Sequence, residues 1–216
     1  TGVYHLALLA TMAFYLHAVH RSNAPFDWGQ RIVLGALLGI TFLARNDAVF
    51  FIAALLATHW LMGERLQQGG LRSRFIDCVV AGVTSILVAL PWLVYNYRLF
   101  GSIIPISGTA QSHTAVFAQN MPVVPATLFE SMFLYAPIPR SLEERSWVMV
   151  FCCLAVVSVV AIFWRCAARQ DRSARRFFVI SLAFAAALSL YYGLFFGAAW
   201  FLPRYLSALS PFLFTM

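Results

Sequence analysis

Residues 31–63, RIVLGALLGITFLARNDAVFFIAALLATHWLMG, decide the fold, because Arg45, Asn46 and Asp47 separate two apolar runs. A single helix over this stretch would be about 50 Å long at ~1.5 Å per residue. The hydrocarbon core of a bilayer is only about 30 Å thick, and charges inside it are costly. We therefore expect two short spans, 31–44 and 48–63, that meet at the polar residues in a recess lined by protein.

The composition predicts a membrane protein. Hydrophobic residues make up 62% of the chain and charged residues 11%, whereas a soluble domain is about half apolar and about a quarter charged. The formal net charge is +7, and all 15 basic residues are arginine, which excludes a Schiff-base or phosphate-loop lysine. The arginines lie in short loops between apolar runs, so they indicate orientation in a membrane and no nucleic-acid partner.

The apolar runs predict an all-α fold, a polytopic transmembrane helix bundle with short broken helices and a long outer-face loop. We expect residues 1–216 to be a fragment of one transmembrane domain. The long loop covers residues 98–146, with one helix around 126–134. Small-residue surfaces at 183–187 and 193–197 favour close helix packing. The expected spans are 3–19, 31–44, 48–63, 75–97, 147–164, 177–200 and an incomplete run at 205–216.

Charge distribution predicts the orientation of these spans. The loops 64–74 and 165–176 are rich in arginine and belong in the cytoplasm by the positive-inside rule. The loop 98–146 has no positive bias and belongs outside. Since each span changes sides, the Arg45 turn and the turn before Tyr205 share the outer face with this loop, which is longer than a simple connection requires.

Three separated motifs carry a family resemblance. They are Gly39-Ile-Thr-Phe-Leu-Ala-Arg-Asn-Asp47, Pro91-Trp-Leu-Val-Tyr-Asn-Tyr-Arg-Leu-Phe-Gly-Ser102 with the following Pro105-Ile-Ser-Gly-Thr109, and Trp200-Phe-Leu-Pro-Arg-Tyr205. The set resembles the C superfamily (GT-C) of polytopic membrane glycosyltransferases. The bacterial enzymes that use polyprenyl-phosphate sugars, including arabinofuranosyltransferases and mannosyltransferase-like proteins, are the most similar branch.

The resemblance implies transfer of a sugar from a polyprenyl-phosphate donor to a glycan, lipid or protein acceptor on the extracytoplasmic face. It also implies a multi-pass protein of the bacterial inner (plasma) membrane, in contact with membrane lipid. The catalytic base of such enzymes lies in a first outer loop, which we expect to precede this sequence in a longer protein. The catalytic residue is therefore left unassigned, and Asp47 is not given that role.

Arg45 is the main candidate for binding the donor phosphate, since a guanidinium offers a planar fork of donors to phosphate oxygens. Arg204, which follows Pro203, is the second candidate. The structural alternatives are an Arg45–Asp47 pair that joins two half-helices and an Arg204 side chain that extends to lipid headgroups. Asp47 could orient Arg45, hold a divalent ion or contact a sugar hydroxyl.

Other polar and aromatic residues are supporting candidates for substrate contact, each with an ordinary alternative as an interfacial anchor or solvated loop residue. No cofactor is assigned, and a divalent metal ion stays open, although His113 has no second ligand at a recognisable spacing. The leading alternative function is a transporter or flippase of a lipid-linked or anionic substrate, and a third is a noncatalytic scaffold. The supporting residues are Asp47, Tyr205, Asn96, Arg98 and His113.

Overall fold

The computed structural model is all-helical over the part of the chain that it describes, and no strand occurs there. The all-α fold class is therefore confirmed. Among the residues that the structure describes, four helices are long and apolar enough to cross a membrane by length and composition. The described residues are 2–21, 26–62, 70–103, 116–132, 146–169, 172–196 and 202–214.

The chain divides into two compact units, and each is described by itself. The first contains Thr1–Ile103 together with Asp171–Phe184, and the second contains Ile104–Gln170 together with Ala185–Met216. Helix α9, Arg172–Phe195, contributes its first part to one unit and its second part to the other.

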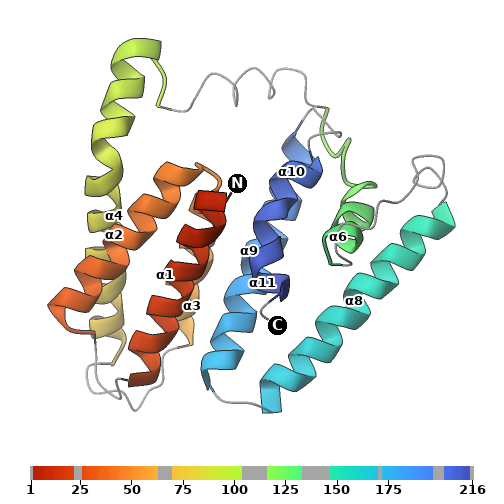
Figure 1. Cartoon of the computed structure of the whole chain (residues 1–216), viewed down its shortest axis with the longest axis horizontal. Helices are drawn as coiled ribbons and strands as arrows, with labels where there is room; N and C mark the ends of the chain where they lie inside the picture. Colours follow the sequence, from red (N-terminus) through yellow and green to blue (C-terminus); the bar gives the residue numbers. More distant parts are fainter. Residues whose placement is uncertain are drawn as a thin grey trace. The chain divides into compact units, whose positions relative to one another are not determined.

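Four helices form most of the first unit: α1 (Gly2–Arg21), α2 (Trp28–Ala44), α3 (Ala48–Leu61) and α4 (Gly70–Phe100). Helix α2 packs against the other three. The α2–α3 turn lies at the end of this unit opposite the starts of α2 and α4 (Figure 1). The α2–α3 hairpin therefore has charged side chains at two distant positions, one at its turn and one at its opposite end.

Two glycines bring α2 close to α4. A Cβ atom on Gly35 would lie 2.5 Å from Thr84 Cβ and 2.6 Å from the Ala81 carbonyl oxygen. A Cβ atom on Gly39 would lie 2.7 Å from Val88 Cβ. Small residues allow this backbone approach between helices in a membrane, and here they let α2 and α4 pack closely.

Helix α4 continues beyond the predicted span 75–97 at both ends, from Gly70 to Phe100. Helical backbone satisfies its own hydrogen bonds, so a helix can extend through the interface into water. Pro91 lies inside α4, where its missing N–H removes one helical hydrogen bond. The loop predicted from residue 98 consequently begins after Phe100.

The second unit contains α6 (Val124–Met132), α8 (Ser146–Arg169), α10 (Leu202–Leu206), the 3-10 turn η2 (Ser207–Leu209) and α11 (Ser210–Phe214). Helix α6 packs against α8, α10 and α11. The helix expected at 126–134 is thus present, beginning two residues earlier, at Val124. The run predicted from residue 205 is divided into short helices instead of one span.

Helix α9 ends at Phe195, not at Trp200 as the apolar run predicts. Asn120, which is fully buried, donates from Nδ2 to the carbonyl oxygens of Tyr192 at 3.3 Å and Phe196 at 2.6 Å. The Ala118 N–H also donates to the Leu194 carbonyl, at 2.9 Å. These donors come from a segment distant in sequence and satisfy carbonyls that a helix end leaves open, which local apolarity does not reveal.

Candidate functional site

The turn between α2 and α3 is formed by Arg45, Asn46 and Asp47. Arg45 has extended backbone angles, φ −161° and ψ 135°, and this conformation ends α2. Its N–H donates to the Thr41 carbonyl at 3.3 Å, and its own carbonyl accepts from the Ala48 N–H at 3.1 Å. The Asn46 carbonyl accepts from the Val49 N–H at 3.2 Å. The chain changes direction here while keeping these backbone groups paired.

The side chains of the turn form an ion pair. Arg45 Nη2 donates to Asp47 Oδ2. The extended backbone of Arg45 brings together two side chains that would diverge at this spacing on a continuous helix. The Asp47 side chain is 6% exposed and that of Arg45 is 18% exposed. The pairing predicted as the structural alternative is therefore present, and Arg45 is its more accessible member.

Helix α1 supplies a third side chain to the turn. Arg45 Cζ lies over the ring of Tyr4, 5.1 Å from its centroid, within the range of a cation–π interaction. Tyr4 is only 2% exposed. A partly accessible guanidinium held by a buried carboxylate and a buried aromatic ring is an arrangement able to bind an anion, because its position is fixed in advance.

Asn96 and Arg98 both lie in the last turns of α4, although the outer loop was expected to begin at residue 98. Asn96 is 6% exposed, and its Nδ2 has no hydrogen-bond partner among the described residues. Arg98 is exposed. Burial leaves Asn96 as an interior polar group of its unit, whereas Arg98 is at the surface.

Arg204 and Tyr205 belong to α10 in the second unit. The Tyr205 ring stacks on the Tyr192 ring, with ring centroids 4.5 Å apart. It also makes an edge-to-face contact with the Phe196 ring, with centroids 4.8 Å apart. Arg204 is exposed. Since Arg45 is in the other unit, a phosphate site shared by the two arginines stays a prediction.

His113 lies outside the described residues. Within the described ranges, no group of three or more His, Cys, Asp or Glu side chains could hold a metal ion. The possibility of a divalent ion at Asp47 therefore gains no support from neighbouring ligands.

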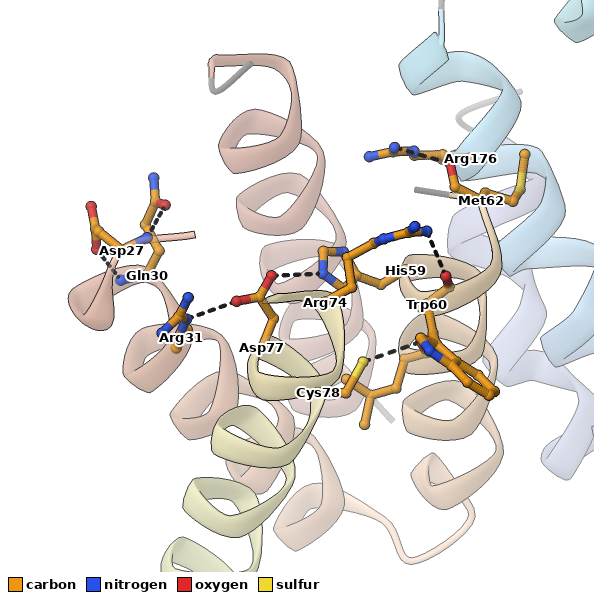
Figure 2. A network of polar contacts seen from close by, with 11 residues as sticks. Asp27, Gln30, Arg31, His59, Trp60, Met62, Arg74, Asp77, Cys78 and Arg176 are labelled. Carbon is orange, nitrogen blue, oxygen red and sulfur yellow. Dashed lines mark hydrogen bonds and ion pairs between the residues drawn. The ribbon is translucent and has the colours of Figure 1, made fainter. Parts of the chain in front are cut away.

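A second charged cluster, which the sequence interpretation missed, lies at the other end of the α2–α3 hairpin (Figure 2). Asp77 of α4 accepts from Arg31 Nε at 2.7 Å through Oδ1, and its Oδ2 lies 3.2 Å from His59 Nε2. The exposed fractions of the three side chains are 10% for Arg31, 8% for His59 and 3% for Asp77. One buried carboxylate therefore connects α2, α3 and α4.

Two further arginines bind the C-terminal end of α3 (Figure 2). Arg74 Nη1 donates to the Trp60 carbonyl at 2.8 Å, and Arg176 Nη2 donates to the Met62 carbonyl at 3.2 Å. Cations are favourable at a helix C-terminus, where carbonyl oxygens lack helical partners. These contacts join α4 and the first part of α9 to α3.

The signals for this second cluster were present in the sequence. Asp77 is the only acidic residue of the predicted span 75–97, and Arg31 begins the predicted span 31–44. An isolated acid in an apolar run requires a partner, and the partners are Arg31 and His59. His59 contacts Asp77 from α3, which is distant from Asp77 in the sequence. No local signal pointed to Tyr4.

Comparisons with protein-family models, curated proteins and solved structures give no match for this chain.

Proposed function

We propose that this chain is part of a membrane glycosyltransferase that transfers a sugar from a polyprenyl-phosphate donor to an acceptor on the extracytoplasmic face. In this proposal, the Arg45 guanidinium binds the donor phosphate. The observation that supports it best is that Arg45 is the accessible member of a buried group at the end of a helical hairpin. The order of motifs that resembles the C superfamily of glycosyltransferases also supports it.

The chemistry explains why a cation is needed at that position. The acceptor hydroxyl oxygen attacks C1 of the sugar, the bond from C1 to the phosphate oxygen breaks, and the hydroxyl proton passes to a base. Negative charge on the phosphate grows as this bond breaks, so a guanidinium already in place lowers the barrier. The base is not assigned to a residue of this chain, and Arg204 is proposed as a second phosphate contact.

The proposal also includes the placement of the hairpin in the membrane. Helices α2 and α3 are the short broken segments, and their turn opens toward the outer leaflet, where a polyprenyl phosphate is located. The basic segments 64–74 and 165–176 face the cytoplasm. Both were expected to be loops, but the first includes the start of α4 and the second includes the end of α8 and the start of α9. Residues between α4 and α8 contribute the long outer-face loop.

The test uses the full-length protein in nanodiscs, with decaprenyl phosphate as the probe for binding. Transfer is assayed with radiolabelled decaprenyl-phosphate arabinose and decaprenyl-phosphate mannose, supplied separately. We expect Arg45→Ala to weaken decaprenyl phosphate binding at least about tenfold, because a hydrogen bond to a charged group contributes roughly 1.5–3 kcal/mol. Arg45→Lys should be intermediate, since it keeps the charge and loses the planar fork.

Controls separate binding from the structural role of the ion pair. Arg45→Ala/Asp47→Asn removes both charges and avoids an unpaired buried carboxylate, so it should fold and still fail to bind. Arg72→Ala removes an exposed arginine near the start of α4 and should leave binding unchanged. If the double variant binds and transfers as the unmodified protein does, Arg45 has only a structural role and the proposal is wrong.

Transport of a lipid-linked or anionic substrate is the second candidate function. The observation in its favour is the buried cluster of Arg31, Asp77 and His59, since ionisable groups within membrane segments often belong to ion or proton pathways. Translocation of a fluorescent polyprenyl-phosphate lipid between the leaflets of proteoliposomes, without sugar transfer, would favour this function. Sugar transfer without translocation would exclude it.

A further inference from the structure

We infer that Tyr4 is a positioning residue that holds the Arg45 guanidinium in the orientation that binds phosphate. This inference rests on the proposed function of Arg45 and adds a residue from a different helix to that site. Tyr4 acts through Arg45, because its own side chain is almost completely buried, with 2% of the residue exposed.

The guanidinium is constrained in two independent directions. Asp47 binds it through Nη2, and its Cζ lies over the Tyr4 ring, 5.1 Å from the ring centroid. An ion pair at one edge restrains the position of the guanidinium but permits rotation about the line to the carboxylate. The attraction between the cation and the Tyr4 ring holds Cζ over the ring and opposes that movement, so the two contacts together restrain the guanidinium.

The exposed fractions of the side chains agree with these roles, in which Arg45 binds the ligand and Asp47 and Tyr4 hold Arg45 in place. The Arg45 side chain is 18% exposed and that of Asp47 is 6% exposed, so Arg45 is the one of the three that offers most surface to a ligand. A fork that is already oriented loses little conformational freedom when phosphate binds. Tyr4 also links the α2–α3 turn to α1, so the orientation of Arg45 depends on the packing of three helices.

The experiment replaces Tyr4 in the full-length protein in nanodiscs and measures decaprenyl phosphate affinity. Tyr4→Phe keeps the ring face and should bind within about twofold of the unmodified protein. Tyr4→Leu removes the ring and should weaken binding about tenfold, in keeping with a desolvated cation–π contact. A fully fluorinated phenylalanine at position 4 has nearly the same shape as phenylalanine but a reversed ring quadrupole. It should weaken binding even if the leucine variant does not fold.

A matched control lies on the same helix. Tyr15 is fully buried. Tyr15→Leu removes an aromatic ring, as Tyr4→Leu does, but at a position far from Arg45. It should reduce stability without changing affinity when measured at a temperature where the protein is folded. In an Arg45→Ala background, Tyr4→Leu should cause no further loss of affinity, because the two residues act as one unit.

The outcomes separate this inference from the proposed function. If Arg45→Ala weakens binding as expected and the fluorinated residue binds as phenylalanine does, Tyr4 does not position Arg45, and the proposed function stands. If Arg45→Ala leaves binding unchanged, both are overturned. Equal losses in Tyr4→Phe and Tyr4→Leu would assign the effect to the hydroxyl group and would also overturn the inference.

Discussion

At the scale of single residues, Asp77 is bound by side chains from two other helices. Its two carboxylate oxygens have different partners, Arg31 and His59, and its side chain is 3% exposed. A buried pair loses much of its solvation free energy, so its net contribution to stability is small. Removing one member, however, leaves the remaining charge without compensation. The cluster thus penalises any arrangement that separates α2 or α3 from α4.

Asp77→Asn tests this explanation, because it removes the charge and keeps the shape. We expect a loss of about 3–5 kcal/mol in the free energy of unfolding, measured by unfolding in mixed micelles with sodium dodecyl sulfate. Asp27→Asn is the matched control. Asp27 accepts from the Gln30 N–H at 2.7 Å at the start of α2, and asparagine caps helices equally well. Equal effects of the two substitutions would contradict a buried ionic role for Asp77.

At the scale of elements, the close contact between α2 and α4 depends on glycine residues of α2, which have no side chain. The Thr84 side chain and the Ala81 backbone lie where a Cβ atom of Gly35 would be. Phe42 and Trp92 extend the same contact toward the α2–α3 turn, with ring centroids 6.4 Å apart. The interface therefore combines close backbone approach with an aromatic contact near its end.

Gly35→Ala should destabilise the protein by about 1–3 kcal/mol, since the added methyl group must displace backbone atoms of α4. Gly82→Ala is the control on the facing helix, because no atom lies within 4 Å of an added Cβ there. This control should be neutral or stabilising by up to about 1 kcal/mol, as alanine is the better helix former. The same unfolding measurement checks both, and equal stability of the two variants would disprove close packing at Gly35.

At the scale of the whole molecule, the distribution of arginine predicts which helix ends face the cytoplasm. Arg31, Arg74 and Arg176 are buried, and they lie at the same end of the first unit as the Asp77 cluster (Figure 2). The α2–α3 turn lies at the opposite end (Figure 1). Since the positive-inside rule assigns arginine-rich ends to the cytoplasm, Arg45 should face outward.

Cysteine labelling measures this orientation directly. In a variant without native cysteines, with Cys78→Ser, Cys152→Ala, Cys153→Ser and Cys166→Ser, single cysteines replace Ile103 or Leu71. Both positions are exposed, at 55% and 64%. We expect a membrane-impermeant maleimide to label position 103 in intact cells and position 71 only after lysis. The reverse pattern would place Arg45 on the cytoplasmic side and contradict the proposed function.

Apolar length and composition were sufficient to predict an all-helical protein with long apolar helices, because these properties are local. Local polar signals also mark some helix ends, such as the end of α2 before Arg45. Contacts between distant segments could not be predicted in this way. Close packing was expected at 183–187 and 193–197. A Cβ atom on Gly193 would lie 2.5 Å from Met121 Sδ, so that residue is closely packed, but the approach of α2 to α4 at Gly35 and Gly39 was not predicted. Asp77 was overlooked because hydrophobicity averaged over a span conceals a single charge.

In the candidate site too, the residues that are adjacent in sequence could be predicted, and the residue contributed by another helix could not. Arg45 and Asp47 were selected from three consecutive residues, and their ion pair is present. Tyr4 contacts Arg45 from another helix, so its contribution depends on how α1 packs against α2. The roles of Arg45, Arg204, Asn96 and Arg98 in binding substrate stay predictions.

In the proposed placement of α2 and α3 in a membrane, the lengths of these helices make the surrounding lipid part of the environment of Arg45. These helices contain 17 and 14 residues, or about 25 and 21 Å at the standard rise. Each is shorter than a typical hydrocarbon layer, and a short hydrophobic helix is accommodated by local thinning of the lipid around it. Longer acyl chains raise the cost of that thinning. Access of a ligand headgroup to Arg45 should therefore decrease as the host membrane becomes thicker.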